Sequence, residues 1–459
     1  MILSVKRKPD GSIEKYKARL VALGNRQKES SYDLIKSGTA RGSTVKMLVA
    51  LQAKTSAASM VLDIKGAYLK SPIQDWNKEK LFLRYPDGRI FKLRKYLYGL
   101  KQAGYEWQRN ITSTLIKLKY VQSKEDPLVF FKREGTKWIT MCLHVDDFFV
   151  VSSETNWLTR LHSELSKAYG TVTICSGNLL SYLGMQVSVN AENGDITLGQ
   201  PGYARQLCDQ FLVGPRAVVH TPMTVNPTPQ IDDQVPYDVT EYLRAVGGLN
   251  YLAVSTRPDL LYSLSRLAGA CSAPTRKDWK RVIRVMLYVA NTLDRGLTFR
   301  PGQVELHAYV DSSFNLYHDG KAHYGYCFML GRGDAAFYSC SRRMRVQPLS
   351  STEAEYVAFC ECGREYEYFE RLLVEIGFGQ RRPPIIYEDN QSCIDMLHGR
   401  SRHTASKHIN PKFHYGRDLV LAGRVIVKHI VTAAQVADIF TKPLGRTTFE
   451  PLADSLLCT

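Results

Sequence analysis

Apolar residues in the first third of the chain come in short runs of strand length that are separated by polar turns. The runs 138–143 and 148–151 flank the short segment His144-Val145-Asp146-Asp147. Two β-rich runs around a short polar turn predict a β-hairpin. Another β-branched and apolar run, residues 60–64, carries one carboxylate, Asp63, within it. Residues 1–155 are therefore predicted to mix strands with helices.

Residues 237–295 have the spacing of helices, with apolar residues recurring three and four positions apart. The two apolar stripes are Tyr242, Ala245, Val246, Leu249 and Leu252, then Trp279, Val282, Ile283, Met286, Leu287 and Ala290. We assign both stripes to core packing. The pattern from residue 302 onward is α/β, with strands predicted near 304–311, 324–330, 335–340, 385–388 and 424–430. A long helix is expected from residue 352, another between the last two strands, and a final helix at the end.

Two proline-containing segments interrupt these patterns. Residues 221–236 carry Pro222, Pro227, Pro229 and Pro236 with Asn and Asp between them, and this composition disfavours both helix and sheet. We predict a linker there, and a shorter break at 300–302. The chain has 459 residues, which is too many for one hydrophobic core. Ordinary domain sizes predict roughly two to four domains.

The composition narrows the class of protein. The chain has 61 Lys and Arg against 44 Asp and Glu, a net charge of +17 that fits a phosphate-backbone partner but also a merely basic soluble protein. The ten cysteines include no Cys-x-x-Cys pair, which predicts a reducing compartment without a disulfide framework. No apolar run approaches the ~20 residues of a membrane-spanning helix, and the N-terminus lacks the apolar region of a signal peptide. We expect a cytoplasmic protein, with particle-associated and nuclear locations as alternatives.

The carboxylates of the first third suggest a chemistry. Asp146 and Asp147 are adjacent at the predicted hairpin tip, where like charges repel each other. A divalent cation is the usual compensation, because hard cations take oxygen ligands, although Asp is also common in turns for conformational reasons. A strand-borne Asp63 beside a turn-borne Asp pair suits a two-metal phosphoryl-transfer site, as in nucleic-acid polymerases.

Three ordered segments carry a family resemblance. Residues 61–69, 97–103 and 144–147 together resemble the reverse transcriptase of copia-type retrotransposons. The resemblance implies that Asp63, Asp146 and Asp147 hold two divalent ions, Mg²⁺ or Mn²⁺. It also implies that Tyr68, five residues after Asp63, is the steric gate that lies under the sugar of the incoming nucleotide and rejects a 2′-hydroxyl.

Further segments extend the resemblance to nucleotide, template and primer contacts. Residues 15–21 resemble the family's fingers strand, which implies that Lys17 and Arg19 reach the incoming triphosphate. The planar fork of Arg suits phosphate. The implied template and primer contacts are Tyr98, Gly99, Lys101, Gln102, His144, Tyr182, Gly184 and Met185. The chain departs from the family pattern at two positions, with Gly104 in place of Pro after the template-binding turn and His144 in place of Tyr before the Asp pair. The first departure puts the rigidity of the turn in doubt, and the second alters the neighbour of the primer end.

A second set of carboxylates follows the linker. Its members are Asp311 at the end of a predicted strand, Glu355 near the start of the long helix, Asp389 at a strand-to-helix junction and Asp438 near the start of the last helix. Together they resemble the ribonuclease H domain that follows the polymerase in copia-type elements, and such a cluster holds two Mg²⁺ ions. Glu353 competes with Glu355, since residues two apart on a helix point to nearly opposite sides. The family spacing favours Glu355, whose other reading is a capping box with Thr352.

The sequence therefore predicts an α+β reverse transcriptase of the fingers-palm-thumb type with an antiparallel palm sheet, followed by an α/β ribonuclease H-like domain. Expected domains are 1–220 (fingers and palm), 221–300 (linker and helical thumb or connection) and 301–459 (ribonuclease H-like). Implied partners are an RNA template, a DNA or tRNA primer, the RNA–DNA hybrid and dNTPs, with protease and integrase expected elsewhere on a polyprotein. The alternative is a catalytically decayed nucleic-acid-binding protein, which is expected to lose some of the seven carboxylates, yet all are present. An integrase-type nuclease fits less well, because it predicts one carboxylate triad and no Asp-Asp hairpin.

Overall fold

The computed structural model describes residues 1–7, 13–29, 32, 35–73, 80–85, 87–214, 216–225, 234–314, 316, 320–400 and 411–459, the side chains of 6, 7, 14, 17, 411 and 412 excepted. The chain forms two compact units. The first comprises residues 1–45 and 57–177, and the second comprises residues 46–56 and 178–459. Within the described residues, no helix has the length and apolar character needed to cross a bilayer.

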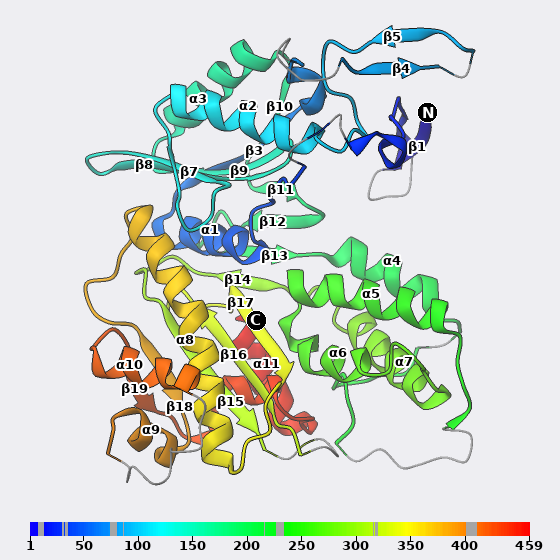
Figure 1. Cartoon of the computed structure of the whole chain (residues 1–459). Coiled ribbons are helices and arrows are strands. Elements are labelled where there is room, and N and C mark those ends of the chain that lie inside the picture. Colours follow the sequence, from blue (N-terminus) through cyan, green and yellow to red (C-terminus); the bar gives the residue numbers. More distant parts are fainter. Residues whose placement is uncertain are drawn as a thin grey trace. The chain divides into compact units, whose positions relative to one another are not determined.

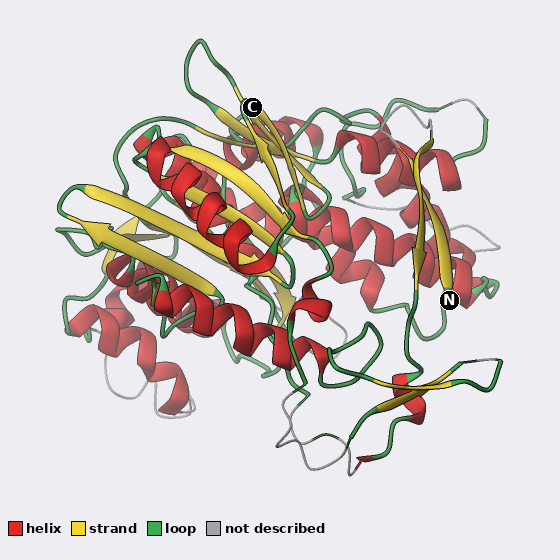
Figure 2. Ribbon diagram, turned by 90° about the horizontal axis from the view of Figure 1, so that it is seen from above, coloured by secondary structure: helices red, strands yellow, loops and turns green. Residues whose placement is uncertain are grey.

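The first unit is built on a six-stranded antiparallel sheet with the strand order β10-β3-β9-β8-β7-β6 (Figures 1 and 2). Its strands are β3 (Ala58–Ile64), β6 (Val121–Gln122), β7 (Val129–Glu134), β8 (Lys137–His144), β9 (Asp147–Ser152) and β10 (Val172–Ser176). Residues 138–143 of β8 are all buried, and strands with both faces covered read as continuous apolar runs rather than as alternating ones. The predicted hairpin and antiparallel palm sheet are confirmed.

Helices and two small ribbons complete the first unit. Helix α3 (Thr155–Tyr169) packs on β3, β9 and β10, while α2 (Ala103–Lys117) packs on the short 3-10 helix η3 (Ala67–Lys70). The ribbons are β1 (Ile2–Arg7) with β2 (Ile13–Arg19), and β4 (Phe82–Arg84) with β5 (Ile90–Lys92). Another 3-10 helix, η1, spans Gly24–Arg26, and α1 (Gly42–Thr55) runs from the first unit into the second.

The second unit begins with an antiparallel four-stranded sheet of order β11-β12-β13-β14. The elements of this part are β11 (Leu179–Tyr182), β12 (Met185–Val189), β13 (Ile196–Gly199), α4 (Pro201–Phe211), α5 (Val239–Ser255), η5 (Pro258–Leu260), α6 (Leu261–Ala268), α7 (Arg276–Ala290) and β14 (Leu297–Phe299). The helices expected in 237–295 are confirmed. The three-residue strand β14 was not predicted, because so short a run becomes a strand only by pairing with the distant β13. Pro227 and Pro229 of the predicted linker lie outside the described residues.

The second sheet of this unit is mixed, with strand order β17-β16-β15-β18-β19. Strands β15, β16 and β17 pair antiparallel, whereas β15, β18 and β19 pair parallel. The elements are β15 (His307–Ser313), β16 (His323–Met329), β17 (Tyr338–Arg343), α8 (Ser351–Glu375), β18 (Ile385–Glu388), α9 (Gln391–Leu397), η7 (Pro411–His414), α10 (Tyr415–Leu421), β19 (Ile426–His429), η8 (Thr432–Ala434), η9 (Val436–Phe440) and α11 (Arg446–Leu457). This is the mixed, helix-flanked sheet expected of the ribonuclease H-like part.

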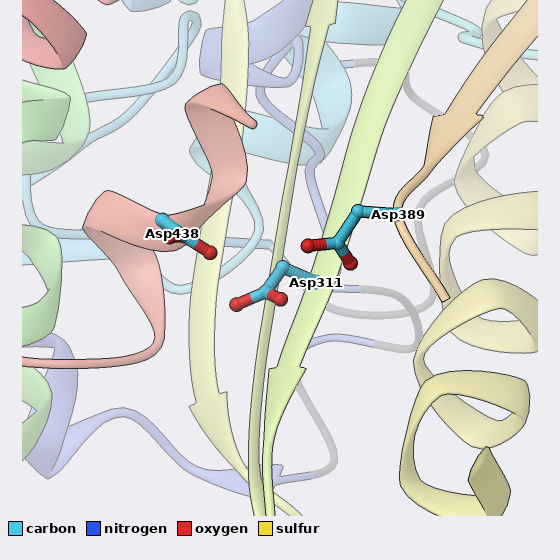
Figure 3. Close-up of side chains that lie close together, drawn as sticks. All are labelled: Asp311, Asp389 and Asp438. Atoms are coloured by element: carbon cyan, nitrogen blue, oxygen red, sulfur yellow. The ribbon is translucent and has the colours of Figure 1, made fainter. Parts of the chain in front are cut away.

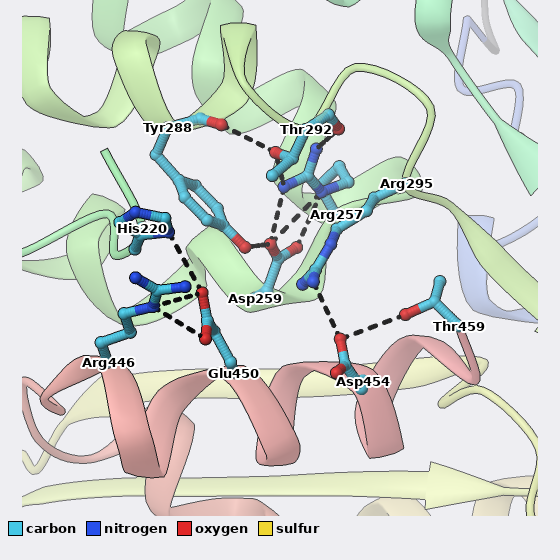
Figure 4. Close-up of polar contacts among 10 residues, drawn as sticks. All are labelled: His220, Arg257, Asp259, Tyr288, Thr292, Arg295, Arg446, Glu450, Asp454 and Thr459. Atoms are coloured by element: carbon cyan, nitrogen blue, oxygen red, sulfur yellow. Dashed lines mark hydrogen bonds and ion pairs between the residues drawn. The ribbon is translucent and has the colours of Figure 1, made fainter. Parts of the chain in front are cut away.

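The helices from α4 through α7 share one hydrophobic core with β16, η9 and α11. Arg295 donates to the Asp454 carboxylate of α11 at 2.8 Å across this junction, and a buried polar network holds η5 to α7 beside it (Figure 4). Arg257 donates to the carboxylate of Asp259, and the Tyr288 hydroxyl donates to the same carboxylate at 2.7 Å. The helical segment and the ribonuclease H-like sheet thus fold as one compact unit, which residues 178–220 also join. The functional division at 220 and 300 stays a prediction.

Candidate active sites

The register of the first unit's sheet sets two of the predicted polymerase carboxylates opposite each other. Asp63 on β3 is paired directly opposite Asp147, the first residue of β9. Ile64 donates its backbone N–H to the carbonyl of Asp146 at 3.0 Å, which ties the hairpin tip to β3. Asp63 and Asp147, 84 positions apart in sequence, therefore lie opposite each other on neighbouring central strands, with Asp146 in the adjoining turn. Among the described residues, these three are not one of the groups whose carboxylate oxygen atoms lie within 4.8 Å of one another.

The turn that carries the Asp pair is tight and strained. Strands β8 and β9 leave only two residues between them, and Val145 has a φ of 60°. A β-branched residue rarely adopts this left-handed conformation, and such strain concentrates at functional sites. The indole N–H of Trp107 on α2 donates to the Val145 carbonyl at 2.6 Å, and His144 is paired with Asp147 across the turn. The surrounding structure thus holds the Asp pair in a fixed conformation.

Aromatic and basic side chains lie beside these carboxylates. The rings of Tyr68 and Tyr98 make an edge-to-face contact with centroids 4.8 Å apart, and the Arg19 guanidinium lies 5.7 Å from the Tyr98 ring centroid. Burial raises the pKa of Tyr68, and the nearby Asp146 charge raises it further. The pKa of Tyr98 is raised by the same two causes. The structure therefore gathers the predicted gate, one predicted template residue and one predicted triphosphate ligand. The side chain of Lys17 lies outside the described residues.

The predicted template-binding turn packs backbone to backbone against residues 22–24. Gly99 has a φ of 90°, and a Cβ on it would lie 2.1 Å from the carbonyl oxygen of Ala22. Gln102 is buried and accepts a hydrogen bond from Gln27 at 2.8 Å. The Lys101 ammonium donates to the hydroxyl of Tyr32 at 2.7 Å. Gly99 is thus required by conformation and by space.

Gly104, the departure from the family's proline, lies in the first turn of α2 and not in the template-binding turn itself. A Cβ at this position would come within 2.7 Å of the Ser37 hydroxyl oxygen. A cavity of about 20 Å³ lies nearby, lined among others by Tyr68, Gly104 and Trp107. The missing proline therefore changes the start of a helix, and Gly99 and Gln102 hold the turn by their own contacts.

The predicted primer grip is a hairpin of β11 and β12 in the second unit. Its turn residues, Leu183 and Gly184, have φ values of 49° and 74°. Tyr251 donates its hydroxyl to the Leu183 carbonyl at 2.8 Å, and a Cβ on Gly184 would lie 2.6 Å from that hydroxyl oxygen. Tyr182 and Met185 are buried, so only the backbone and the exposed positions of this hairpin face solvent. Its contact with a primer stays a prediction.

Three carboxylates of the second site, Asp311, Asp389 and Asp438, come from separate segments of the second unit (Figure 3). Tyr309 on β15 is in register with Tyr387 on the parallel strand β18. Asp311, within β15, and Asp389, directly after β18, are each two residues further on and therefore lie side by side just beyond the paired stretch of these strands. Asp438 joins them from η9 and not from the last helix, which begins only at Arg446. Oxygen atoms of these three side chains lie within 4.8 Å of one another.

Glu355 reaches the same region from the second turn of α8. Its carboxylate, with those of Glu388 and Asp389, forms another group whose oxygen atoms lie within 4.8 Å of one another. Glu353 has a different role, because its backbone N–H donates to the Ser350 side chain at 3.2 Å and its carboxylate accepts from Leu349 N–H at 2.7 Å. The N-cap is thus Ser350, and the capping box of Thr352 with Glu355 is wrong. The sequence preference for Glu355 over Glu353 agrees with this geometry.

The electrostatics of this cluster favour a bound cation. Burial raises the pKa of Asp311 to about 8, opposed by Lys442 and reinforced by Asp438. Burial and Glu388 raise the pKa of Glu355 well above its ordinary value, and burial does the same to Glu388. Crowded carboxylates in a desolvated place either bind protons or bind a divalent ion. The donor set is all oxygen, which is the chemistry that Mg²⁺ and Mn²⁺ prefer.

Sequence reasoning missed three residues of this site. Thr441 donates its hydroxyl to the Asp311 carboxylate. The Lys442 ammonium lies 2.7 Å from one oxygen of Asp438 and 4.0 Å from one oxygen of Asp311. Glu388 is fully buried beside Asp389. The sequence signal for Glu388 was its position next to the predicted ligand Asp389. Thr441 and Lys442 reach the site only because residues 436–442 fold against it.

Comparisons with known proteins agree with these motifs. Residues 3–225 match the family described as reverse transcriptase (RNA-dependent DNA polymerase). The chain is 31% identical over 462 residues, 98% of its length, to the retrovirus-related Pol polyprotein from transposon RE2 of Arabidopsis thaliana. It is 28% identical over 468 residues to the corresponding polyprotein from transposon TNT 1-94 of Nicotiana tabacum. The chain belongs to the copia-type retrotransposon reverse transcriptases.

This member of the family spans about a third of the length of the curated relatives it matches, 31% of the first and 34% of the second. A solved structure, that of the foamy viral protease-reverse transcriptase in complex with double-stranded DNA, shares the fold. The TM-score is 0.54 at 12% identity, covering 94% of this chain and 66% of that one. This likeness bears on the fold alone.

Proposed function

We propose that the chain is an RNA-directed DNA polymerase that also cleaves the RNA of an RNA–DNA hybrid. The observation that carries the proposal is the pairing of Asp63 opposite Asp147, with Asp146 in the adjoining turn, in a member of the reverse transcriptase family. The intact second cluster on a mixed sheet supports the cleavage activity.

In the polymerase site, Asp63, Asp146 and Asp147 would hold Mg²⁺ or Mn²⁺. Such ions supply charge stabilisation for in-line phosphoryl transfer. Arg19 would hold the triphosphate, because its fork donates two parallel hydrogen bonds to phosphate. Tyr68, held against Tyr98, would fill the space next to the sugar and so exclude a 2′-hydroxyl.

In the second site, Asp311, Glu355, Asp389 and Asp438 would hold the ions that hydrolysis requires. The substrates proposed are an RNA template, a DNA or tRNA primer, dNTPs and the resulting hybrid, and the net charge of +17 supports phosphate-backbone partners. The chain would act as part of a Pol polyprotein in the cytoplasm, in a particle or in the nucleus.

The test separates the two activities in the same chain. Asp146→Asn should reduce primer extension on an RNA template by ~100-fold or more, since charge stabilisation at the transition state is lost, while hybrid cleavage persists. Asp389→Asn and Glu355→Gln should do the reverse, and Glu353→Gln is the matched control on the same helix. Loss of both activities in a folded Asp146→Asn protein would contradict the two-site assignment. Hybrid binding without either activity in the parent would favour the decayed alternative.

A further inference from the structure

Glu388 is a buried carboxylate that none of the family motifs assigns. It is the last residue of β18 and is 0% exposed. One of its oxygens, Oε1, accepts the backbone N–H of Asn390 at 3.0 Å. The other, Oε2, has no hydrogen-bond partner in the structure. A buried charge without a partner is costly, so this oxygen needs an explanation.

The Glu388 carboxylate belongs to a group of three carboxylates. Oxygen atoms of Glu355, Glu388 and Asp389 lie within 4.8 Å of one another. Glu355 is also buried, at 5% exposure, and its own Oε2 is likewise without a partner. Two buried carboxylates, each with an unpartnered oxygen, therefore lie together in one small space, which is the environment that a divalent cation stabilises.

The neighbouring group of Asp311, Asp389 and Asp438 differs in its compensation. Lys442 forms an ion pair with Asp438, and Thr441 donates to Asp311. Among the described residues, no lysine or arginine is ion-paired with Glu355 or Glu388. The Glu388 group thus has the greater need for a positive charge that the protein does not itself supply.

We propose that Glu388 is a fifth ligand of the ribonuclease H-like site and that it holds one divalent cation together with Glu355 and Asp389. Asp311 and Asp438 would hold the other ion, and Asp389 would be shared between the two. The inference rests on the proposed function for its role in cleavage, although the binding of the ion itself does not.

The experiment counts Mn²⁺ ions bound to the full chain, from the electron paramagnetic resonance signal of free Mn²⁺ during titration. Glu388→Gln keeps the size of the side chain and an acceptor for Asn390 N–H. This variant should weaken the binding of one ion by at least ~10-fold, because a charged ligand becomes a neutral one. Asp311→Asn should weaken the other ion, Asp389→Asn should weaken both, and Glu353→Gln should match the parent.

Thermal unfolding in EDTA distinguishes a metal ligand from a structural group. Glu388→Gln should be at least as stable as the parent without metal, because it removes a buried charge. If Glu388→Gln is less stable than the parent, the Glu388→Asp variant is measured instead, because it keeps the charge but has a shorter side chain. An unchanged Mn²⁺ affinity of Glu388→Asp would then overturn the proposal. Equal Mn²⁺ binding by folded Glu388→Gln and parent would also overturn it. Hybrid cleavage by the parent is scored separately, so failure of the proposed function does not mimic failure of this inference.

Discussion

Replacement of Gly184 by alanine tests the reading of the β11–β12 hairpin. Gly184 has a φ of 74°, and an added Cβ would lie 2.6 Å from the hydroxyl oxygen of Tyr251. That hydroxyl donates to the Leu183 carbonyl at 2.8 Å, so it cannot move away without losing the hydrogen bond. The substitution therefore strains the backbone and disrupts a contact that holds the turn to α5.

The two costs can be estimated separately. A left-handed conformation costs a non-glycine residue about 1–2 kcal/mol, and the loss of one hydrogen bond costs about 1 kcal/mol. Gly184→Ala should thus destabilise the second unit by about 2–3 kcal/mol. Gly423 is the matched control, because its φ is 68° and a Cβ there would meet nothing within 4 Å. Gly423→Ala should cost only the conformational part.

A double-mutant cycle with Tyr251→Phe isolates the contact. Without the hydroxyl, the alanine Cβ would meet only the Cζ atom of residue 251 at 3.8 Å, an ordinary contact. Gly184→Ala should then cost about 1 kcal/mol less in the Phe background than in the parent. Urea unfolding gives the free energies, and hydrogen–deuterium exchange of peptides spanning 178–190 shows whether the loss is local. If Gly184→Ala costs the same as Gly423→Ala, or costs the same with Tyr251 and with Phe at position 251, the clash with the Tyr251 hydroxyl is excluded as a cause.

Three further predictions concern the gate, the catalytic turn and the buried network of Figure 4. Tyr68→Ala should admit ribonucleotides, measured as the ratio of dNTP to rNTP incorporation, and an unchanged ratio in an active variant would contradict the gate. His144→Tyr should restore the family's residue and increase primer extension, whereas equal or lower extension would show that His144 does not reduce polymerase activity. Asp259→Asn should destabilise the second unit by about 3–5 kcal/mol at pH 7, because it leaves the Arg257 guanidinium buried without its charge partner. Burial alone would raise the pKa of Asp259, but Arg257 holds it below the ordinary value. The contribution of this carboxylate to the free energy of unfolding is therefore complete above pH ~4 and is lost as the pH falls further. The difference in the free energy of urea unfolding between variant and parent should accordingly shrink below that pH. A difference that does not change with pH would exclude the charge pair as its cause.

Elements whose signal is local could be predicted from the amino-acid sequence. The apolar runs around Asp146 predicted the hairpin, and the order of three motifs predicted the family, because each depends on residues that are close in the chain. Helical spacing in the stripe from Tyr242 to Leu252 predicted the buried face of α5, and all five of its residues are buried. Helical periodicity showed that only one of Glu353 and Glu355 can face Asp311, and the family spacing favoured Glu355.

Features that depend on partners far away in the chain became visible only in the folded structure. The strand β14 exists because residues 297–299 pair with 196–198, a contact between segments that local patterns do not connect. The buried face of α7 also differs from the apolar stripe predicted from Trp279 to Ala290. Val285, Tyr288 and Val289 face the common core, whereas Leu287 of the predicted stripe is only half-buried.

The same distinction explains the candidate sites. Motifs named the carboxylates, but register set Asp63 opposite Asp147, and parallel pairing set Asp311 beside Asp389. Glu388 had no motif of its own and became a candidate ligand only when its burial and its unpartnered oxygen were known. Burial and the convergence of charges are properties of packing, and packing joins residues that the sequence keeps far apart.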